Sequence, residues 1–296
     1  MASKYLIRFG VLLLWACSNP QKEESEWIPL LDADLSKWEP WLAIPHKSLG
    51  IPGYEYVENV KVDTIPPLGF SNEKNVFSVI EQDSEQVLRV SGEIFGSLMS
   101  KAEYENYHFR MKVKWGDMKW KPMLNAKLNN GLLYHSIGEP GAGLWNCWMT
   151  SLEFEIEHTN FGDFISINDA GNIHAKSPAT KGEDGRYYFY ANADLIDFGW
   201  KRFAAGRCFK TRDLEKPKGE WTQIDLICFE NLALHLVEGQ VVMAVYDSKI
   251  FDGENWITMN KGKLQLQSEG AETYFKELEI KELSSLPKEF AGFVKK

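Results

Sequence analysis

Apolar and polar residues alternate along short runs over most of the chain. The clearest run extends from Tyr107 to Trp115, where apolar residues take every odd position and His, Arg or Lys takes every even one. A period of two indicates a β-strand with one buried side. Runs of the same kind predict further strands at Val76–Glu81, Val87–Gly92, Gly131–Ser136, Leu152–His158, Trp221–Phe229, Leu232–Val237, Val241–Tyr246, Lys263–Ser268 and Tyr274–Leu283.

Turn signals such as Glu238-Gly239 and Asp252-Gly253 separate these strands, and no amphipathic helix of comparable clarity interrupts them. Many strands without interleaved helices favour two packed sheets. We therefore predict an all-β protein, a jelly-roll β-sandwich, with one domain over residues 27–285 and a C-terminal tail at 286–296. Trp38–Asn75 and Phe161–Pro217 break the alternation. We predict that both are long loops, which usually carry function in a compact domain.

Composition narrows the possible partners. Of the 296 residues, 44% are hydrophobic and 13% aromatic, which is sufficient for a packed core. The formal net charge is −9 and no run of Lys and Arg exceeds two residues. Nucleic acid is therefore not an expected partner.

The N-terminus has the pattern of a signal peptide. Lys4 and Arg8 precede a compact apolar run, too short to span a bilayer, that ends in Leu14-Trp15-Ala16-Cys17. This ending resembles the lipobox of bacterial lipoproteins. We predict a signal peptide at residues 1–16, a lipidated Cys17 and an acidic tether at 17–26. The protein would then lie outside the cytoplasm, in the periplasm or at the cell surface, and contact the membrane only through its lipid anchor. An ordinary cleaved secretory signal is the alternative.

Three cysteines remain after Cys17: Cys147, Cys208 and Cys228. An odd number leaves at least one thiol unpaired. A Cys208–Cys228 disulfide and three buried thiols are both compatible with the sequence.

The segment most suggestive of chemistry is Leu152-Glu153-Phe154-Glu155-Ile156-Glu157. As a strand, it would point its apolar residues into the sandwich and its three carboxylates together from the opposite face, with neighbours roughly 6.6–7 Å apart. Carboxylates in a row repel each other, and repulsion with partial burial raises pKa values, as acid–base chemistry requires. A solvated polar face without chemistry is the alternative.

Other polar and aromatic residues could complete a site around these carboxylates. Asn129 and His135 share one parity on the neighbouring predicted strand, so His135 could reach Glu153 or Glu155 as a general base, although a lone His is more often structural. Lys101 or Arg110 could neutralise a carboxylate or stabilise an oxyanion. Aromatic rings that could stack on a sugar are present at Trp145, Trp148 and Trp200.

Eight short motifs occur in the same order as in a known family. They are Trp27–Asp32, Gly92–Lys101, Asn129–Gly131, Leu152–Ile156, Gly219–Trp221, Glu238-Gly239, Gly262–Gln267 and Phe275–Ile280. In this order the chain resembles the 3-keto-disaccharide hydrolase domain family, which is common in Bacteroidetes. The chain departs from the family pattern at Glu155, Glu238 and Asn130, which replace an amide, an Asn and a Ser. The resemblance implies a concanavalin/LamG-like jelly roll with a carbohydrate site on its concave sheet.

Three functional hypotheses follow from this resemblance and from the carboxylate strand. In the first, an enzyme cleaves 3-keto-glycosides after proton abstraction next to the ketone. His135 or Glu153 would be the base, Lys101 or Arg110 the oxyanion stabiliser, and Glu155 the acid. Further substrate contacts are expected from Asn129, Trp145, Trp148 and Glu157. The sequence makes no cofactor certain, and a divalent metal held by Glu and His could replace the cation.

The second hypothesis is a retaining glycosidase, with Glu153 as nucleophile and Glu157 as acid. The third is a non-catalytic lipoprotein that binds sugar on Trp145, Trp148 and Trp200.

Overall fold

The computed structural model describes residues 26–54, 65–142, 147–168 and 170–295. Lipidation of Cys17, the signal peptide and the contribution of Trp145 lie outside the described residues and stay predictions. No helix in the described part of the chain is long and apolar enough to cross a membrane.

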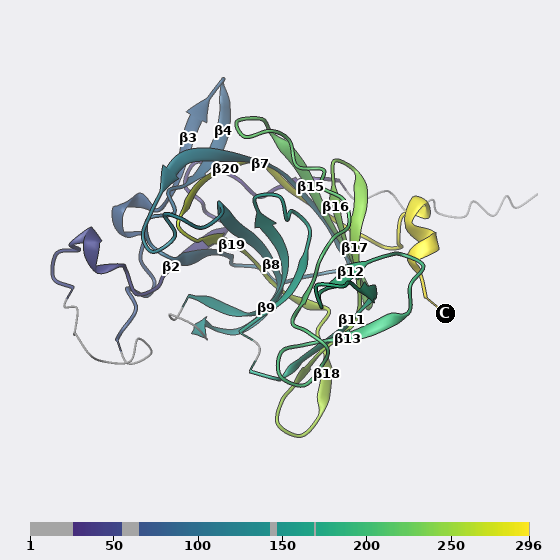
Figure 1. Cartoon of the computed structure of the whole chain (residues 1–296). Helices are drawn as coiled ribbons and strands as arrows, with labels where there is room; N and C mark the ends of the chain where they lie inside the picture. The colour runs from purple at the N-terminus through teal and green to yellow at the C-terminus, as the bar shows by residue number, and fades with distance from the viewer. Residues whose placement is uncertain (1–25, 55–64, 143–146, 169, 296) are drawn as a thin grey trace, which may run out of the picture.

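Two large antiparallel sheets pack face to face, which confirms the predicted all-β jelly-roll architecture (Figure 1). The larger sheet contains β1 (Ile28–Pro29), β3 (Phe77–Gln82), β4 (Glu85–Val90), β7 (Tyr107–Lys119), β11 (Ile173–Lys181), β12 (Tyr187–Phe189), β13 (Leu195–Phe198), β15 (Thr222–Phe229), β16 (Leu232–Val237), β17 (Gln240–Phe251), β18 (Trp256–Thr258) and β20 (Ala271–Glu282). The smaller sheet contains β2 (Trp38–Leu42), β5 (Gly96–Ser100), β6 (Tyr104–Glu105), β8 (Asn129–Ala142), β9 (Trp148–Glu157), β10 (Phe164–Ile167), β14 (Arg207–Cys208) and β19 (Lys261–Ser268).

The strand order shows which strands can share a site. It is β12-β11-β17-β16-β15-β7-β20-β4-β3 in the larger sheet and β14-β10-β9-β8-β19-β5-β2 in the smaller one. Three short 3₁₀ helices, η1 (Lys47–Leu49), η3 (Glu73–Asn75) and η5 (Lys288–Phe293), complete the described elements. Strands β10, β9, β8 and β19 are adjacent, so their outward side chains form one continuous face.

Alternation along the strands builds the core between the sheets. Phe109 and Met111 of β7 are fully buried, as are Leu152, Phe154 and Ile156 of β9. The predicted inward direction of the β9 apolar residues is therefore confirmed.

The long-loop prediction for Phe161–Pro217 is wrong, because this stretch contains β10 to β14. Four of these five strands are only two to four residues long, too short to show a period. In β11 the buried positions include the small residues Ala175, Ser177 and Ala179, which hide the apolar alternation. The Trp38–Asn75 prediction is wrong at its start, where β2 forms the edge of the smaller sheet. The edge position tolerates Pro40.

The C-terminal tail is not separate from the domain. Phe290 and Phe293 pack against the core, and the Tyr246 hydroxyl donates to the backbone oxygen of Phe293. Figure 1 shows this segment, in yellow, beside the larger sheet.

The three cysteines in the described part of the chain form no disulfide and are buried, which confirms the buried-thiol alternative. Cys208 belongs to β14 of the smaller sheet and Cys228 to β15 of the larger one.

One polar residue inside the core gives the fold a testable dependence on pH. The His235 ring stacks on Phe154, and its nitrogens contact the Tyr134 hydroxyl and the Gly162 oxygen. Burial lowers the pKa of His235 from 6.5 to about 4, against the Gly162 hydrogen bond. Between pH 6.5 and about pH 4, His235 is therefore protonated in the unfolded chain but neutral in the folded one.

We expect the contribution of His235 to the free energy of unfolding to fall as pH decreases from about 6.5 to about 4, by up to ~1.4 kcal/mol per pH unit. Urea unfolding at several pH values would show that wild type loses stability relative to His235→Gln as pH decreases through this range. Phe154→Leu is the matched control, because it alters packing at the same place without removing a titrating group. Parallel slopes for wild type and His235→Gln would contradict this account.

Candidate active site

The carboxylates of β9 point away from the core, but they are not solvated. Glu153 is 3% exposed and Glu155 is 4% exposed. Only Glu157, at the end of the strand, is partly open, with 22% of its side chain exposed. Burial of two carboxyls in a row costs free energy unless they are neutral or paired, so their surroundings decide their charge.

A missing side chain on β8 makes room for the Glu153 carboxyl. A Cβ added to Gly131 would lie 2.0 Å from Glu153 Oε1 and 2.7 Å from Gln267 Oε1. The Gln267 side chain in turn hydrogen-bonds Glu153. Glycine at this position therefore lets side chains from β9 and β19 meet above β8.

The Arg207 guanidinium pairs with acidic side chains on the opposite side of the carboxylate cluster. Arg207 of β14 lies 2.8 Å from Asp163, 3.3 Å from Glu157 and 3.5 Å from Glu155. The sequence analysis missed Arg207 because it falls in a stretch predicted to be a loop. No spacing in the sequence connects it to its distant partners.

Burial is the largest cause that raises the pKa of Glu153 and of Glu155 well above the usual value of 4.5. Neighbouring carboxylates raise these pKa values further, and Arg207 opposes the shift. Glu269, a half-buried residue after β19, has its pKa raised to about 8 by burial and by Glu157, against a hydrogen bond from Asn129. The site therefore contains carboxyl groups that stay neutral where ordinary ones ionise.

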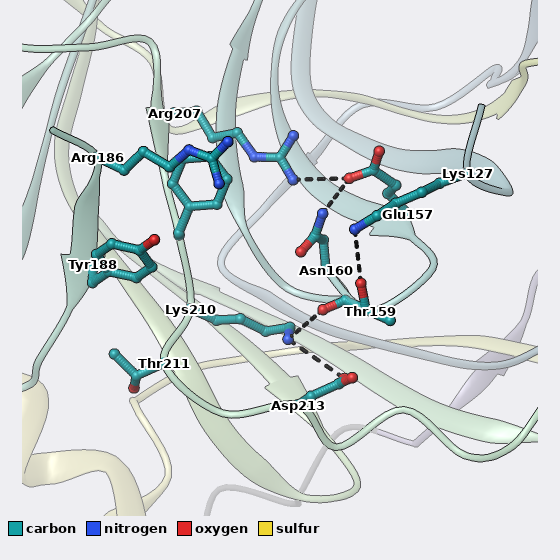
Figure 2. A pocket seen from close by; sticks show the side chains of 11 residues that line it. Lys127, Glu157, Thr159, Asn160, Arg186, Tyr188, Arg207, Lys210, Thr211 and Asp213 are labelled. Carbon is teal, nitrogen blue, oxygen red and sulfur yellow. Dashed lines mark hydrogen bonds and ion pairs between the residues drawn. The ribbon is translucent and has the colours of Figure 1, made fainter. Parts of the chain in front are cut away.

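A cleft of about 490 Å³ opens at the Glu157 end of this cluster (Figure 2). Its walls are formed by Lys127, Glu157, Thr159, Asn160, Arg186, Tyr188, Arg207, Phe209, Lys210, Thr211 and Asp213. Figure 2 shows that Arg207 and Glu157 meet in the wall, where Asn160 also donates to Glu157. The guanidiniums of Arg207 and Arg186 lie 4.6 and 5.0 Å from the centre of the Phe209 ring. Cations, two carboxylates, hydroxyls and aromatic rings thus line one space of the size of a small ligand.

The structure does not bring His135 to the carboxylates, contrary to the sequence prediction. A β-bulge after Tyr134 and a left-handed backbone at His135 (φ 49°) break the alternation of β8. The His135 ring packs against Tyr107 of the other sheet and against Tyr134. Burial lowers its pKa to about 4, so it is a neutral core residue.

The two predicted cations also lie elsewhere. The Lys101 ammonium donates to the backbone oxygen of Ser36. Arg110 is on the outer side of the larger sheet, where it pairs with Glu279 at 2.6 Å and stacks on Trp27. Arg207 is the cation beside the carboxylates, because the strand order places β14 next to β10, which in turn pairs with β9.

Of the other predicted contacts, Asn129 belongs to the site, whereas Trp148 is not among the residues that line the cleft in Figure 2. Asn129 pairs with Glu157 in register and hydrogen-bonds Glu269. Trp148 is 8% exposed, donates to the Gly96 oxygen and stacks on Phe95. Trp200 is 44% exposed, and its indole nitrogen donates to Ser166.

Within the described ranges, no group of three or more His, Cys, Asp and Glu residues is arranged to hold a metal ion. The metal site proposed from Glu and His side chains lacks its histidine, because the His135 ring packs against Tyr107 and Tyr134 in the core. The donors present therefore do not fit the metal alternative of the sequence analysis.

Comparison with known proteins shows the family of this chain. The model of the 3-keto-alpha-glucoside-1,2-lyase-like domain matches residues 26–281. The chain belongs to this family. No curated protein matches it.

Similar solved structures are distant. A "Putative glycosyl hydrolase" from Parabacteroides distasonis has 16% identity and a TM-score of 0.43, over 87% of this chain and 100% of that one. The carbohydrate-binding module CBM66 from Bacillus subtilis has 7% identity and a TM-score of 0.37, over 69% and 91%. The β-glucanase of Bacillus licheniformis has 9% identity and a TM-score of 0.36, over 89% and 100%.

The raised pKa of Glu155 predicts how stability changes with pH. The unfolded carboxyl ionises above about 4.5, whereas burial favours the protonated form of the folded one. The contribution of Glu155 to stability should therefore fall as pH rises from about 4.5 towards the folded pKa, by up to ~1.4 kcal/mol per pH unit. Gln is isosteric and does not titrate, so Glu155→Gln should gain stability relative to wild type as pH rises above about 4.5. Chemical unfolding at a series of pH values measures this.

Glu103→Gln, at an exposed position that pairs with Lys261, is the control and should show no such trend. A wild type that gains stability over Glu155→Gln with rising pH would show that Glu155 is ionised in the folded protein.

Proposed function

We propose that the protein is an enzyme that cleaves 3-keto-glycosides by removing the proton next to the ketone. Membership of the lyase-like family supports a carbohydrate substrate. The observation that carries the proposal is the pairing of the Glu157 carboxylate with the Arg207 guanidinium, 3.3 Å apart, in the wall of a cleft of about 490 Å³. A base and an oxyanion-stabilising cation are the two groups that this reaction needs in contact with substrate.

The reaction can be written with these two residues. The ketone at C3 acidifies the C2 proton, which Glu157 accepts, and the electron pair forms an enediolate whose oxygen faces Arg207. The enediolate then expels the oxygen substituent at C1, and protonated Glu157 returns its proton to that leaving group. The products are an unsaturated keto-sugar and an alcohol, and addition of water to the double bond gives the free 3-keto-sugar.

Glu153 and Glu155 act behind the cleft in this scheme rather than on the substrate. Neither lines the cleft, and burial raises the pKa of both, which favours their neutral forms. Neutral Glu153 and Glu155 do not compete for Arg207. Its positive charge therefore interacts with Glu157, Asp163 and the developing enediolate. The catalytic base proposed from the sequence thereby moves from Glu153 or His135 to Glu157.

The burial of Glu153 also favours this reaction over a retaining glycosidase. A retaining nucleophile must contact the sugar carbon that it attacks. Glu153 is only 3% exposed and does not line the cleft. The alternative of a non-catalytic sugar-binding protein is distinguished by a turnover assay, because such a protein would release no leaving group.

Turnover of an aryl 3-keto-glucoside, followed by release of the phenol, tests the assignment. Glu157→Gln should lower kcat by about 10²–10⁴-fold through loss of the base. Arg207→Lys, which keeps a charge for Asp163, should lower kcat by about 10²-fold or more. Arg110→Gln is the matched control on the other sheet and should keep wild-type turnover.

Melting curves identify variants that fail to fold, so that loss of activity is interpreted only for folded protein. Absence of phenol release by wild type would refute the proposed function. Full activity of a folded Glu157→Gln would refute its role as base.

Gly131→Ala tests the support behind the cleft. An added methyl must displace the Glu153 carboxyl and the Gln267 amide, the ends of flexible side chains, while the backbone at this position accepts alanine. We expect a folded protein with kcat reduced by about tenfold, because misplaced supporting groups weaken positioning. Gly292→Ala is the control, since its added methyl meets no atom within 4 Å. Unchanged kcat in Gly131→Ala would show that the Glu153–Gln267 contact does not position the site.

A further inference from the structure

The charge of the cleft is opposite to the charge of the whole chain. The sequence contains 33 Lys and Arg against 42 Asp and Glu. The cleft is lined by four cationic side chains, Lys127, Arg186, Arg207 and Lys210, and by only two carboxylates, Glu157 and Asp213. A cleft lined by one sign of charge concentrates ligands of the other sign.

Two of the cations are already matched by acidic partners. Arg207 pairs with Asp163 and Glu157, and the Lys210 ammonium lies 3.4 Å from Asp213. These pairs account for both carboxylates of the lining, so they leave no acidic side chain of the cleft for the other two cations.

Lys127 and Arg186 carry the unmatched charge. The Lys127 ammonium donates to the Thr159 hydroxyl at 2.8 Å, and within the described residues no carboxylate lies within 4 Å of it. Arg186 pairs at 3.7 Å with Asp184, but both side chains are largely exposed, and such a pair contributes little.

Two ammonium groups converge on one residue of the cleft. Lys127 contacts the hydroxyl of Thr159, and Lys210 donates to its backbone oxygen at 2.7 Å. Thr159 follows Glu157 by two residues, and Figure 2 shows the Lys127 ammonium between Glu157 and Thr159 and the Lys210 ammonium on the other side of Thr159. An anion here would receive two charge-assisted hydrogen bonds next to the proposed reaction centre.

We propose that the cleft selects saccharides that carry an anionic oxygen group, which binds between Lys127 and Lys210 beside Thr159. This inference rests on the proposed function, since it names the substrate class of the same cleft. The sugar ring bearing the ketone lies against Glu157 and Arg207, with Tyr188 and Phe209 as aromatic surface. The carboxylate of a uronic acid and a sulfate ester share the required chemistry, and separate substrates distinguish them.

The test compares three aryl substrates with one leaving group: a 3-keto-glucoside, its 6-carboxylate (the 3-keto-glucuronide) and its 6-sulfate. We expect kcat/KM for at least one anionic substrate to exceed that for the neutral one by about tenfold or more. The preference should appear mainly in KM, weaken as salt increases, and be lost in Lys127→Gln. Lys261→Gln, at an exposed pair with Glu103 on another edge, is the matched control and should keep the preference.

The outcomes separate the two proposals. Equal turnover of neutral and anionic substrates, or an equal loss for all three in Lys127→Gln, overturns the anionic preference and leaves the proposed function standing. A preference for the sulfate over the carboxylate supports the inference and assigns sulfate esters. If no substrate is cleaved, the proposed function fails. Calorimetry with glucuronate and glucose then decides the inference, and equal Kd values overturn it.

Discussion

The site depends on one half-buried guanidinium surrounded by more carboxyl groups than it can neutralise. Arg207 contacts Asp163, Glu157 and Glu155, and Glu153 and Glu269 add further acidic groups nearby. Removing one partner of a buried ion pair typically costs about 3–5 kcal/mol, because the other charge is left unpaired. The cluster avoids that cost because some of its carboxyl groups pair with Arg207 and the others favour the protonated form. Asp163 and Glu157 pair directly with Arg207, while burial raises the pKa of Glu153 and of Glu155 and so favours their neutral forms.

The Arg207 cluster also fixes the shape of the cleft. Asp163 accepts from Arg207 with one oxygen and from the Lys210 backbone with the other. The segment from Arg207 to Lys210 is thereby attached to the end of the smaller sheet, and it brings Phe209 and the Lys210 ammonium into the wall. The same contacts that neutralise a buried carboxylate therefore position the surface that meets a ligand.

The sequence predicted those features that follow from the period of a strand and missed those that depend on chain pairing or on a break in the period. The inward side of Leu152, Phe154 and Ile156, and hence the outward side of the three Glu residues, needs only regular alternation. His135 was misplaced because one bulge with a positive φ turns its ring into the core. Arg207 lies on a strand of two residues, and its partners Asp163 and Glu155 are 44 and 52 positions away in sequence. Only the order of strands in the folded sheet brings them together.

Burial of the carboxyl groups and the positive charge of the cleft are two consequences of the same packing. If Glu153, Glu155 and Glu269 were ionised, three negative charges would lie behind Arg207 and would outweigh the cations in front of it. Their field would weaken both an enediolate on Arg207 and an anion beside Lys127. Burial instead raises their pKa values, that of Glu269 to about 8. The four cations of the lining then face Glu157 and Asp213, with Asp163 behind them and Asp184 beside the exposed Arg186. A strand rich in glutamate can in this way support a site that attracts negative charge.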